Sequence, residues 1–210
     1  MQIIQFLKNN RLKIVSIRAL MADFLMGLAG GVSFFFWGNI HGGGDIFLMV
    51  ACALAMGGHI ALLIWGKGGP KAGTSQEKVA GPLPKLWRRT LTPWHYPLDW
   101  GFFNFCVTGL LYAIAGIFSS NFPLALNGIL TASASALGWL WPQNRPIFGR
   151  NVMQVTAVTY ATSSVVSFFA AWVAHSVCIA LASCLYITVN AILYTVRKGN
   201  QSAYTLAQGG

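Results

Sequence analysis

The sequence predicts an all-helical polytopic membrane protein, a bundle of six transmembrane helices in three hairpins with both termini in the cytoplasm. Three observations predict it: the apolar segments, the short connections between them, and the placement of the basic residues. The chain has 210 residues, of which 55% are hydrophobic and 9% are charged, and its mean hydropathy is +0.59. A soluble domain ordinarily carries about 25% charged residues, so this composition indicates a membrane protein.

Six apolar segments have the length that a transmembrane helix needs, which is about 20 residues. They lie at about residues 19–37, 45–66, 99–118, 122–141, 152–172 and 174–196. The first follows a basic leader but is too long for the core of a signal peptide and lacks a small-residue cleavage site near its end. We therefore expect it to be an uncleaved signal-anchor helix.

Three of the connections between segments are short, at 38–44, 119–121 and 172–176. Connections this short place consecutive helices side by side and antiparallel, and they leave no room for an external domain. The amphipathic stretch 2–16 suits a short helix in the cytoplasmic interface. The expected division of the chain is an interfacial segment at 1–18, a transmembrane domain at 19–198 with a cytoplasmic loop at 67–98, and a cytoplasmic tail at 199–210.

All fourteen Lys and Arg residues fall outside the three short connections. They are Lys8, Arg11, Lys13, Arg18, Lys67, Lys71, Lys78, Lys85, Arg88, Arg89, Arg145, Arg150, Arg197 and Lys198. Because loops rich in Lys and Arg stay in the cytoplasm, both termini are predicted to lie inside. The leader and this charge bias favour a bacterial inner membrane. The net charge of +10 is expected to face anionic lipid head groups rather than nucleic acid.

Polar residues inside the apolar segments are the candidates for a transport pathway, because such residues usually face the bundle interior or a water-filled path. His59 follows a run of small residues and could bond another helix, relay a proton or touch a solute. Four hydroxyl residues recur at helical spacing in the fifth segment. The candidate pathway lining comprises His59, Asn127, Thr156, Thr159, Ser163, Ser167 and Asn190. Helix packing through hydroxyl groups is the competing interpretation.

A second candidate site lies at the cytoplasmic edge. Asp23 is expected about one turn into the first segment, where an ion pair with Arg18 is one interpretation and a functional role is the other. Asp99 begins the third segment at the same depth, close to His95. A membrane enzyme would require Asp23, His95 and Asp99 to meet.

The sequence gives no sign of a cofactor or a metal site. Its four cysteines, Cys52, Cys106, Cys178 and Cys184, all lie in apolar segments and are expected to serve as small packing residues. No group of His, Cys, Asp or Glu has the spacing of a metal site. The motifs GxSxG, HExxH and GxxxxGK[ST] do not occur.

The leading hypothesis from the sequence is a small-solute transporter, or permease, without its own ATPase. The uncharged polar groups inside otherwise apolar helices motivate it. The alternative is a non-catalytic subunit or scaffold, in which small-residue helix faces and the tryptophan-rich segment 85–100 bind a second copy or a partner in a membrane complex. A membrane enzyme is the third hypothesis.

Overall fold

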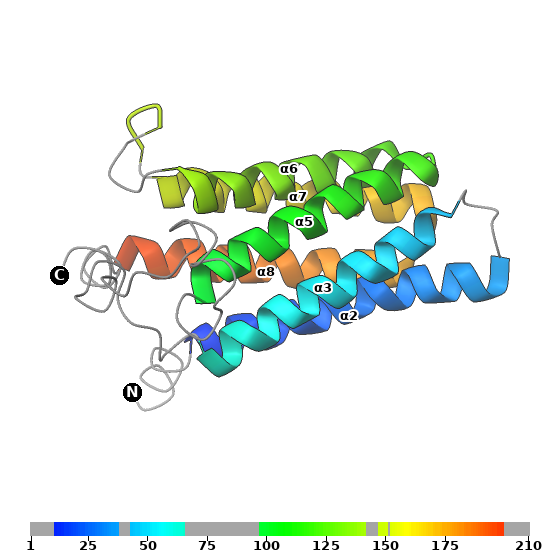
Figure 1. Cartoon of the computed structure of the whole chain (residues 1–210), viewed down its shortest axis with the longest axis horizontal. Helices are drawn as coiled ribbons and strands as arrows, with labels where there is room; N and C mark the ends of the chain where they lie inside the picture. The colour runs from blue at the N-terminus through cyan, green and yellow to red at the C-terminus, as the bar shows by residue number, and fades with distance from the viewer. Residues whose placement is uncertain (1–10, 38–42, 66–96, 142–146, 151, 200–210) are drawn as a thin grey trace, which may run out of the picture.

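The protein is a bundle of six long helices (Figure 1). The computed structural model describes residues 11–37, 43–65, 97–141, 147–150 and 152–199, and these residues contain no strand. The helices are α2 (Arg11–Trp37), α3 (Gly44–Trp65), α5 (Pro97–Phe118), α6 (Phe122–Leu140), α7 (Val152–Ala174) and α8 (Val177–Gly199).

The helices form a closed ring in chain order. Each packs against the helix before and after it, and α8 returns to pack against α2. α2 begins and α8 ends at the same end of the bundle, where α3 also ends and α5 begins (Figure 1). The basic positions Arg11, Lys13, Arg197 and Lys198 lie near these helix ends, which the positive-inside rule predicts to face the cytoplasm. The predicted fold class and its three hairpins are confirmed.

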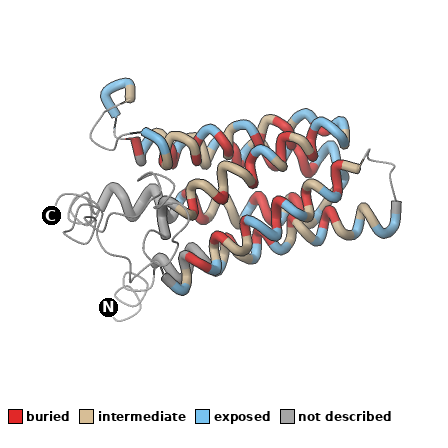
Figure 2. Tube along the Cα trace, in the orientation of Figure 1, coloured by how far each residue is buried: buried red, intermediate tan, exposed pale blue. Residues whose placement is uncertain are grey.

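Buried and exposed positions alternate along the helices (Figure 2). Large apolar side chains lie on the outside, as in a membrane bundle. Phe35, Phe36 and Trp172 are among the large hydrophobic residues on the exterior. Of the nine largest fully buried side chains, six are polar: Asp23, Thr108, Ser135, Thr156, Ser167 and Ser183. Lipid solvates an apolar exterior, whereas polar groups need partners inside the bundle. Together with five helices long and apolar enough to cross a bilayer, this pattern identifies an integral membrane protein.

The helix bounds differ from the sequence prediction mainly at the N-terminus. α2 begins at Arg11, so residues 11–18, expected in the interfacial segment, are part of the first long helix. The sixth helix begins at Val177 rather than near residue 174, because the turn after α7 uses His175 and Ser176. Residues 1–10, most of the expected loop 67–98, and the tail after residue 199 lie outside the described residues.

The closest helix contact is the seam between α5 and α6. At Gly109, Gly116 and Gly128 an added Cβ atom would overlap the backbone of the opposite helix. Glycine is therefore required for this close approach, as at many interfaces of transmembrane helices. At the outer end of the seam, Asn121 caps α6 by accepting from the Leu124 amide and donates to the Ala170 carbonyl oxygen at 3.0 Å. This residue thus ties the α5–α6 turn to α7.

The seam gives a test of the fold. Gly128→Val should lower the free energy of unfolding by about 3 kcal/mol or more, because the new side chain collides with the α5 backbone and the helices must separate. Unfolding by SDS titration in mixed micelles measures the change. Gly57→Ala is the matched control, since no atom lies within 4 Å of its added Cβ. Equal stability of the two variants would contradict the close α5–α6 packing.

Candidate intramembrane polar site

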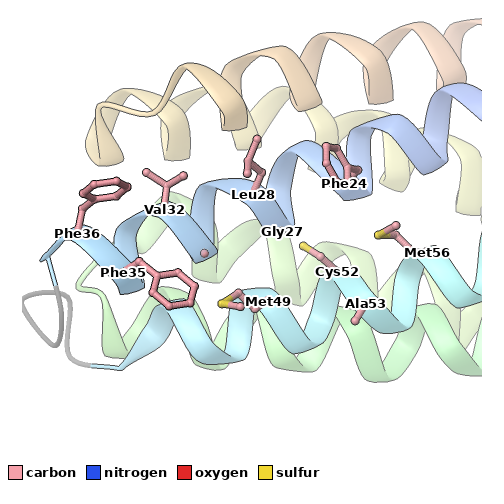
Figure 3. A pocket seen from close by; sticks show the side chains of 11 residues that line it. Phe24, Gly27, Leu28, Val32, Phe35, Phe36, Met49, Cys52, Ala53 and Met56 are labelled. Atoms are coloured by element: carbon pink, nitrogen blue, oxygen red, sulfur yellow. The ribbon is translucent and has the colours of Figure 1, made fainter.

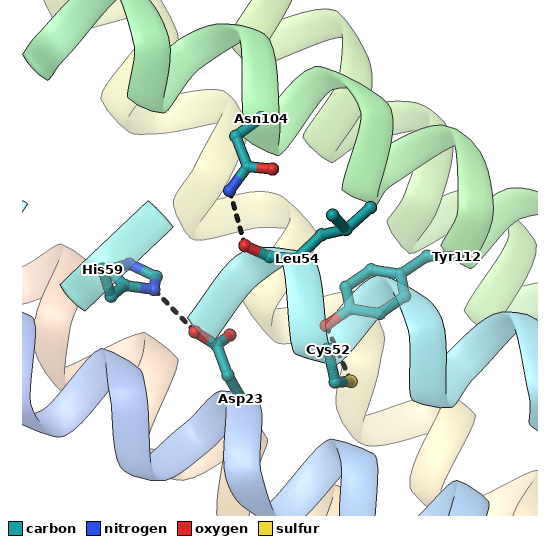
Figure 4. Close-up of polar contacts among 6 residues, drawn as sticks. All are labelled: Asp23, Cys52, Leu54, His59, Asn104 and Tyr112. Atoms are coloured by element: carbon teal, nitrogen blue, oxygen red, sulfur yellow. Dashed lines mark hydrogen bonds and ion pairs between the residues drawn. The ribbon is translucent and has the colours of Figure 1, made fainter. Parts of the chain in front are cut away.

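The site centres on a buried Asp–His pair between α2 and α3 (Figure 4). Asp23 Oδ2 and His59 Nδ1 are 2.6 Å apart, and the Asp23 side chain is fully buried whereas that of His59 is 14% exposed. His59 lies fifteen residues after the start of α3, which is about 22 Å along the helix from its outer end. The pair therefore lies within the hydrocarbon region, where ionisable side chains are rare and mark functional sites by default.

The geometry of a hairpin explains why these two residues meet. Asp23 precedes the outer end of α2 by fourteen residues, and His59 follows the outer start of α3 by fifteen. In an antiparallel pair of helices joined by a short connection, residues equally far from that connection lie at similar depth. Ala22 and Ala55 in the same stretch are buried and small, so the two backbones can come close enough for the side chains to bond.

One oxygen of the Asp23 carboxylate has no hydrogen-bond partner. Oδ2 accepts from or donates to His59, depending on where the proton lies, but Oδ1 is buried and unpartnered among the described residues. A buried unpaired acceptor costs about 1–3 kcal/mol, and more when it is charged. This oxygen is therefore available for a hydrogen-bond donor that enters the bundle.

Aromatic and polar groups from α3 and α5 border the pair. The His59 ring lies 4.6 Å from the Phe105 ring, measured between centroids. The neighbouring Asn104 donates its side-chain amide to the Leu54 carbonyl oxygen at 2.5 Å and so links α5 to α3. Two turns outward from His59, Cys52 and Tyr112 are both buried and their Sγ and Oη atoms lie 3.4 Å apart (Figure 4). The α2–α3–α5 side of the ring thus carries three separate polar contacts.

A separate hydrogen-bond network joins α6 to α7. Asn127 donates to the Ser163 carbonyl oxygen at 2.9 Å, and the Ser163 hydroxyl lies 2.7 Å from that of Thr131. Ser135 and Tyr160 bond one turn further along the same seam. These contacts are interhelical bonds of the kind that hold transmembrane bundles together.

α7 bonds to α8 in the same way. Asn190 donates to the Ser164 hydroxyl at 2.9 Å, and Ser167 bonds the Ser183 hydroxyl. Thr159, in contrast, bonds the carbonyl oxygen of Val155 in its own helix. Of the four hydroxyls in the stripe predicted for the fifth segment, those of Ser163 and Ser167 therefore bond neighbouring helices.

The structure divides the predicted pathway residues between two regions. Asn127 and Ser163 meet at the α6–α7 seam, whereas Ser167 and Asn190 bond at the α7–α8 seam. Thr156 is buried and its hydroxyl has no partner among the described residues. His59 bonds none of these residues and pairs with Asp23 instead.

The structure places Asp23 in α2, six residues after Ile17, where the apolar stretch of that helix begins. Its side chain is buried against His59 rather than paired with Arg18. His95 lies outside the described residues, and Asp99 lies in α5 at a position whose side chain is not described.

The predicted pathway lining left out several polar residues that bond across helices. They are Asn104, Ser135, Tyr160, Ser164 and Ser183. The pairing of Asp23 with His59 could have been predicted from the sequence, because the two residues are almost equally far from the short connection between their helices. Partners across non-consecutive helices, such as α3 and α5, have no such signal because they depend on the order of helices in the ring.

Comparison of the chain with protein-family models, with curated proteins and with solved structures finds no match in any of the three. Function therefore has to be argued from the geometry of this site.

The Asp23–His59 pair predicts a distinctive pattern of stabilities. His59→Leu should lower the free energy of unfolding by about 3 kcal/mol, because it leaves a buried carboxyl group without its partner. The double variant Asp23→Leu/His59→Leu should recover much of that loss, since an apolar pair of this kind is often as stable as a buried ion pair. SDS titration measures both, with His175→Asn, in an exposed outer turn whose left-handed backbone Asn tolerates, as the control. A double variant no more stable than the single one would refute the pairing.

Proposed function

We propose that the protein is a small-solute permease without its own ATPase, in which the Asp23–His59 pair recognises the solute inside the bundle. The observation that carries the proposal is the buried carboxylate oxygen Oδ1 of Asp23, which has no partner among the described residues. A group of this kind is costly in a membrane and is ordinarily found where a substrate, ion or proton passes. A well-packed apolar pair would hold α2 and α3 together at least as well.

Further unpartnered polar atoms support a path for polar solutes. Thr108 Oγ1, Asn127 Oδ1 and Thr156 Oγ1 are buried and unpartnered in the part of the chain that the structure describes. They come from α5, α6 and α7, so together with Asp23 four of the six helices carry such an atom. Unsatisfied buried polar groups in proteins usually bind water or a ligand, and each of these could do so as a solute moves.

The core composition supports a bundle that can rearrange. Most members of the central buried cluster are alanines, contributed by α2, α3, α5, α7 and α8. Small side chains do not lock neighbouring helices in place as interdigitated large ones do, so small sliding motions between packed helices are available. Such motions would expose the pair alternately to the two sides. A bacterial cytoplasmic membrane is the location that fits this proposal and the basic leader.

An uptake experiment tests the permease. Liposomes containing the purified protein are incubated with a mixture of small neutral, anionic and cationic solutes, and their contents are measured by mass spectrometry. At least one solute should accumulate at least tenfold faster than in empty liposomes, and Asp23→Asn should abolish that difference because it removes the charge that recognises the solute. Identical contents in wild-type, variant and empty liposomes would refute the proposal.

A second function, a subunit or scaffold of a membrane complex, is favoured by one surface feature. An apolar groove of about 660 Å³ lies between α2 and α3 (Figure 3). Gly27, Gly31 and Ala53 are among its small lining residues, while Phe24, Leu28 and Phe35 are large and exposed. Small residues beside large apolar ones form a surface on which another transmembrane helix can pack closely.

The scaffold function predicts that filling this groove releases a partner helix. Gly31→Trp should dissociate a stoichiometric complex purified in mild detergent, because the indole would occupy the space of the partner. Val165→Trp, at an exposed position on α7, is the matched control and should leave the complex intact. The native mass of the purified particle is the readout. A wild-type protein that purifies alone as a monomer would argue against the scaffold.

A further inference from the structure

We infer that the Asp23–His59 site exchanges one proton for one monovalent organic cation that carries N–H donors, with guanidinium as the simplest example. This inference rests on the proposed permease function and names its substrate class and its coupling. The site has a carboxylate oxygen that lacks a donor, a partner base that can hold or release a proton, and a neighbouring aromatic ring.

Charge balance in a low-dielectric interior determines the coupling. With one proton shared across the 2.6 Å contact, Asp23 and His59 together are neutral, whether that proton lies on the imidazole or on the carboxyl group. A cation entering this neutral pair would create a net buried charge, which is strongly disfavoured. If the proton leaves as the cation enters, the site becomes a carboxylate, a neutral imidazole and a cation, and it remains neutral. The exchange is therefore one for one and moves no net charge across the membrane.

The groups around the pair do not supply another compensating charge. Asp45, at the outer start of α3, lies fourteen residues before His59, which is about 21 Å along the helix. Apart from Asp45 and Arg18, the titratable groups with described side chains on the helices that pack against α2 and α3 are thiols and phenols, which are ordinarily uncharged at neutral pH. They are Cys52 on α3, Cys106 and Tyr112 on α5, and Cys178, Cys184 and Tyr186 on α8. Arg18, five residues before Asp23 on α2, is half-buried and is the one described cation on these helices. The local exchange of proton and cation thus involves the Asp–His pair itself.

The chemistry of the site favours an organic cation with N–H groups over a metal ion. Asp23 Oδ1 is an acceptor that is satisfied by a donor, and a charged N–H donor forms the stronger hydrogen bond. The Phe105 ring beside His59 offers an aromatic face, with which guanidinium groups interact favourably. Hard metal cations take six or more oxygen ligands, and the described residues hold no group of three or more His, Cys, Asp or Glu side chains.

The test uses guanidinium, which stays charged near neutral pH and so does not cross lipid as a neutral base. Full-length protein is reconstituted into liposomes that enclose a pH-sensitive dye, and guanidinium chloride is added outside. The lumen should become alkaline as protons leave, with one proton exported per labelled guanidinium taken up. Clamping the membrane potential at zero or at an inside-negative value should leave the rate unchanged within about twofold. Tetramethylammonium, which lacks N–H donors, should give at least tenfold slower exchange.

Variants separate the roles of charge and folding. Asp23→Asn should abolish both guanidinium uptake and proton export, whereas Asp23→Glu should keep the ratio of one proton per guanidinium even where the rate falls. Asp45→Asn removes another buried carboxyl group, at the outer start of α3, and should exchange like the wild type. Size-exclusion profiles in detergent confirm that each variant is folded.

Different failures have different meanings. Guanidinium uptake without proton export, or an Asp23→Asn variant that still exchanges, overturns the inference. Uptake of a neutral or anionic solute alone, in the mixture experiment above, also overturns it while leaving the permease function standing. Failure to take up any solute refutes both.

Discussion

The hydrogen bond between Asp23 and His59 is the interaction on which this account of the protein depends. It places two ionisable side chains inside a helical membrane bundle and joins the first hairpin at its interior. Because hydrocarbon cannot solvate either group, each side chain needs the other as a partner. The second carboxylate oxygen, Oδ1, has no hydrogen-bond donor among the described residues. The same bond therefore contributes to cohesion between α2 and α3 and supplies the chemical group from which function is inferred.

The rest of the ring meets the same constraint in a different way. On α6, α7 and α8 the buried polar groups are uncharged, and most find a partner on a neighbouring helix or on their own backbone. The α5–α6 seam relies instead on glycines that bring the two backbones together. Cohesion is thus distributed over hydroxyl, amide and glycine contacts, while the ionisable pair is concentrated in one hairpin. This division is why the candidate site lies between α2 and α3 rather than along the hydroxyl stripe of α7.

The fold was predictable because it follows from quantities that a sequence carries directly. Segment length and the positions of Lys and Arg determine the number of crossings and their orientation. Short connections also place consecutive helices together. The site was less predictable, because the pairing of Asp23 with His59 depends on which residues of α2 and α3 face each other, and hydropathy does not give this. The spacing of Thr156, Ser163 and Ser167 predicted a stripe of hydroxyls on one helix. Whether those hydroxyls bond a neighbouring helix depends on which helices lie beside α7, and the order of helices in the ring determines that.

Nitrogen-15 solid-state NMR of the protein in lipid bilayers tests the Asp23–His59 bond most directly. Replacing His41, His95 and His175 by Gln leaves His59 as the single histidine, so its two ring nitrogens are observed without overlap. We expect Nδ1 to show a strong hydrogen bond to a carboxyl group, and this signature to be lost in Asp23→Asn while the protein stays folded. Identical imidazole spectra for the two proteins would show that the pair does not form and would contradict both the site and the functions built on it.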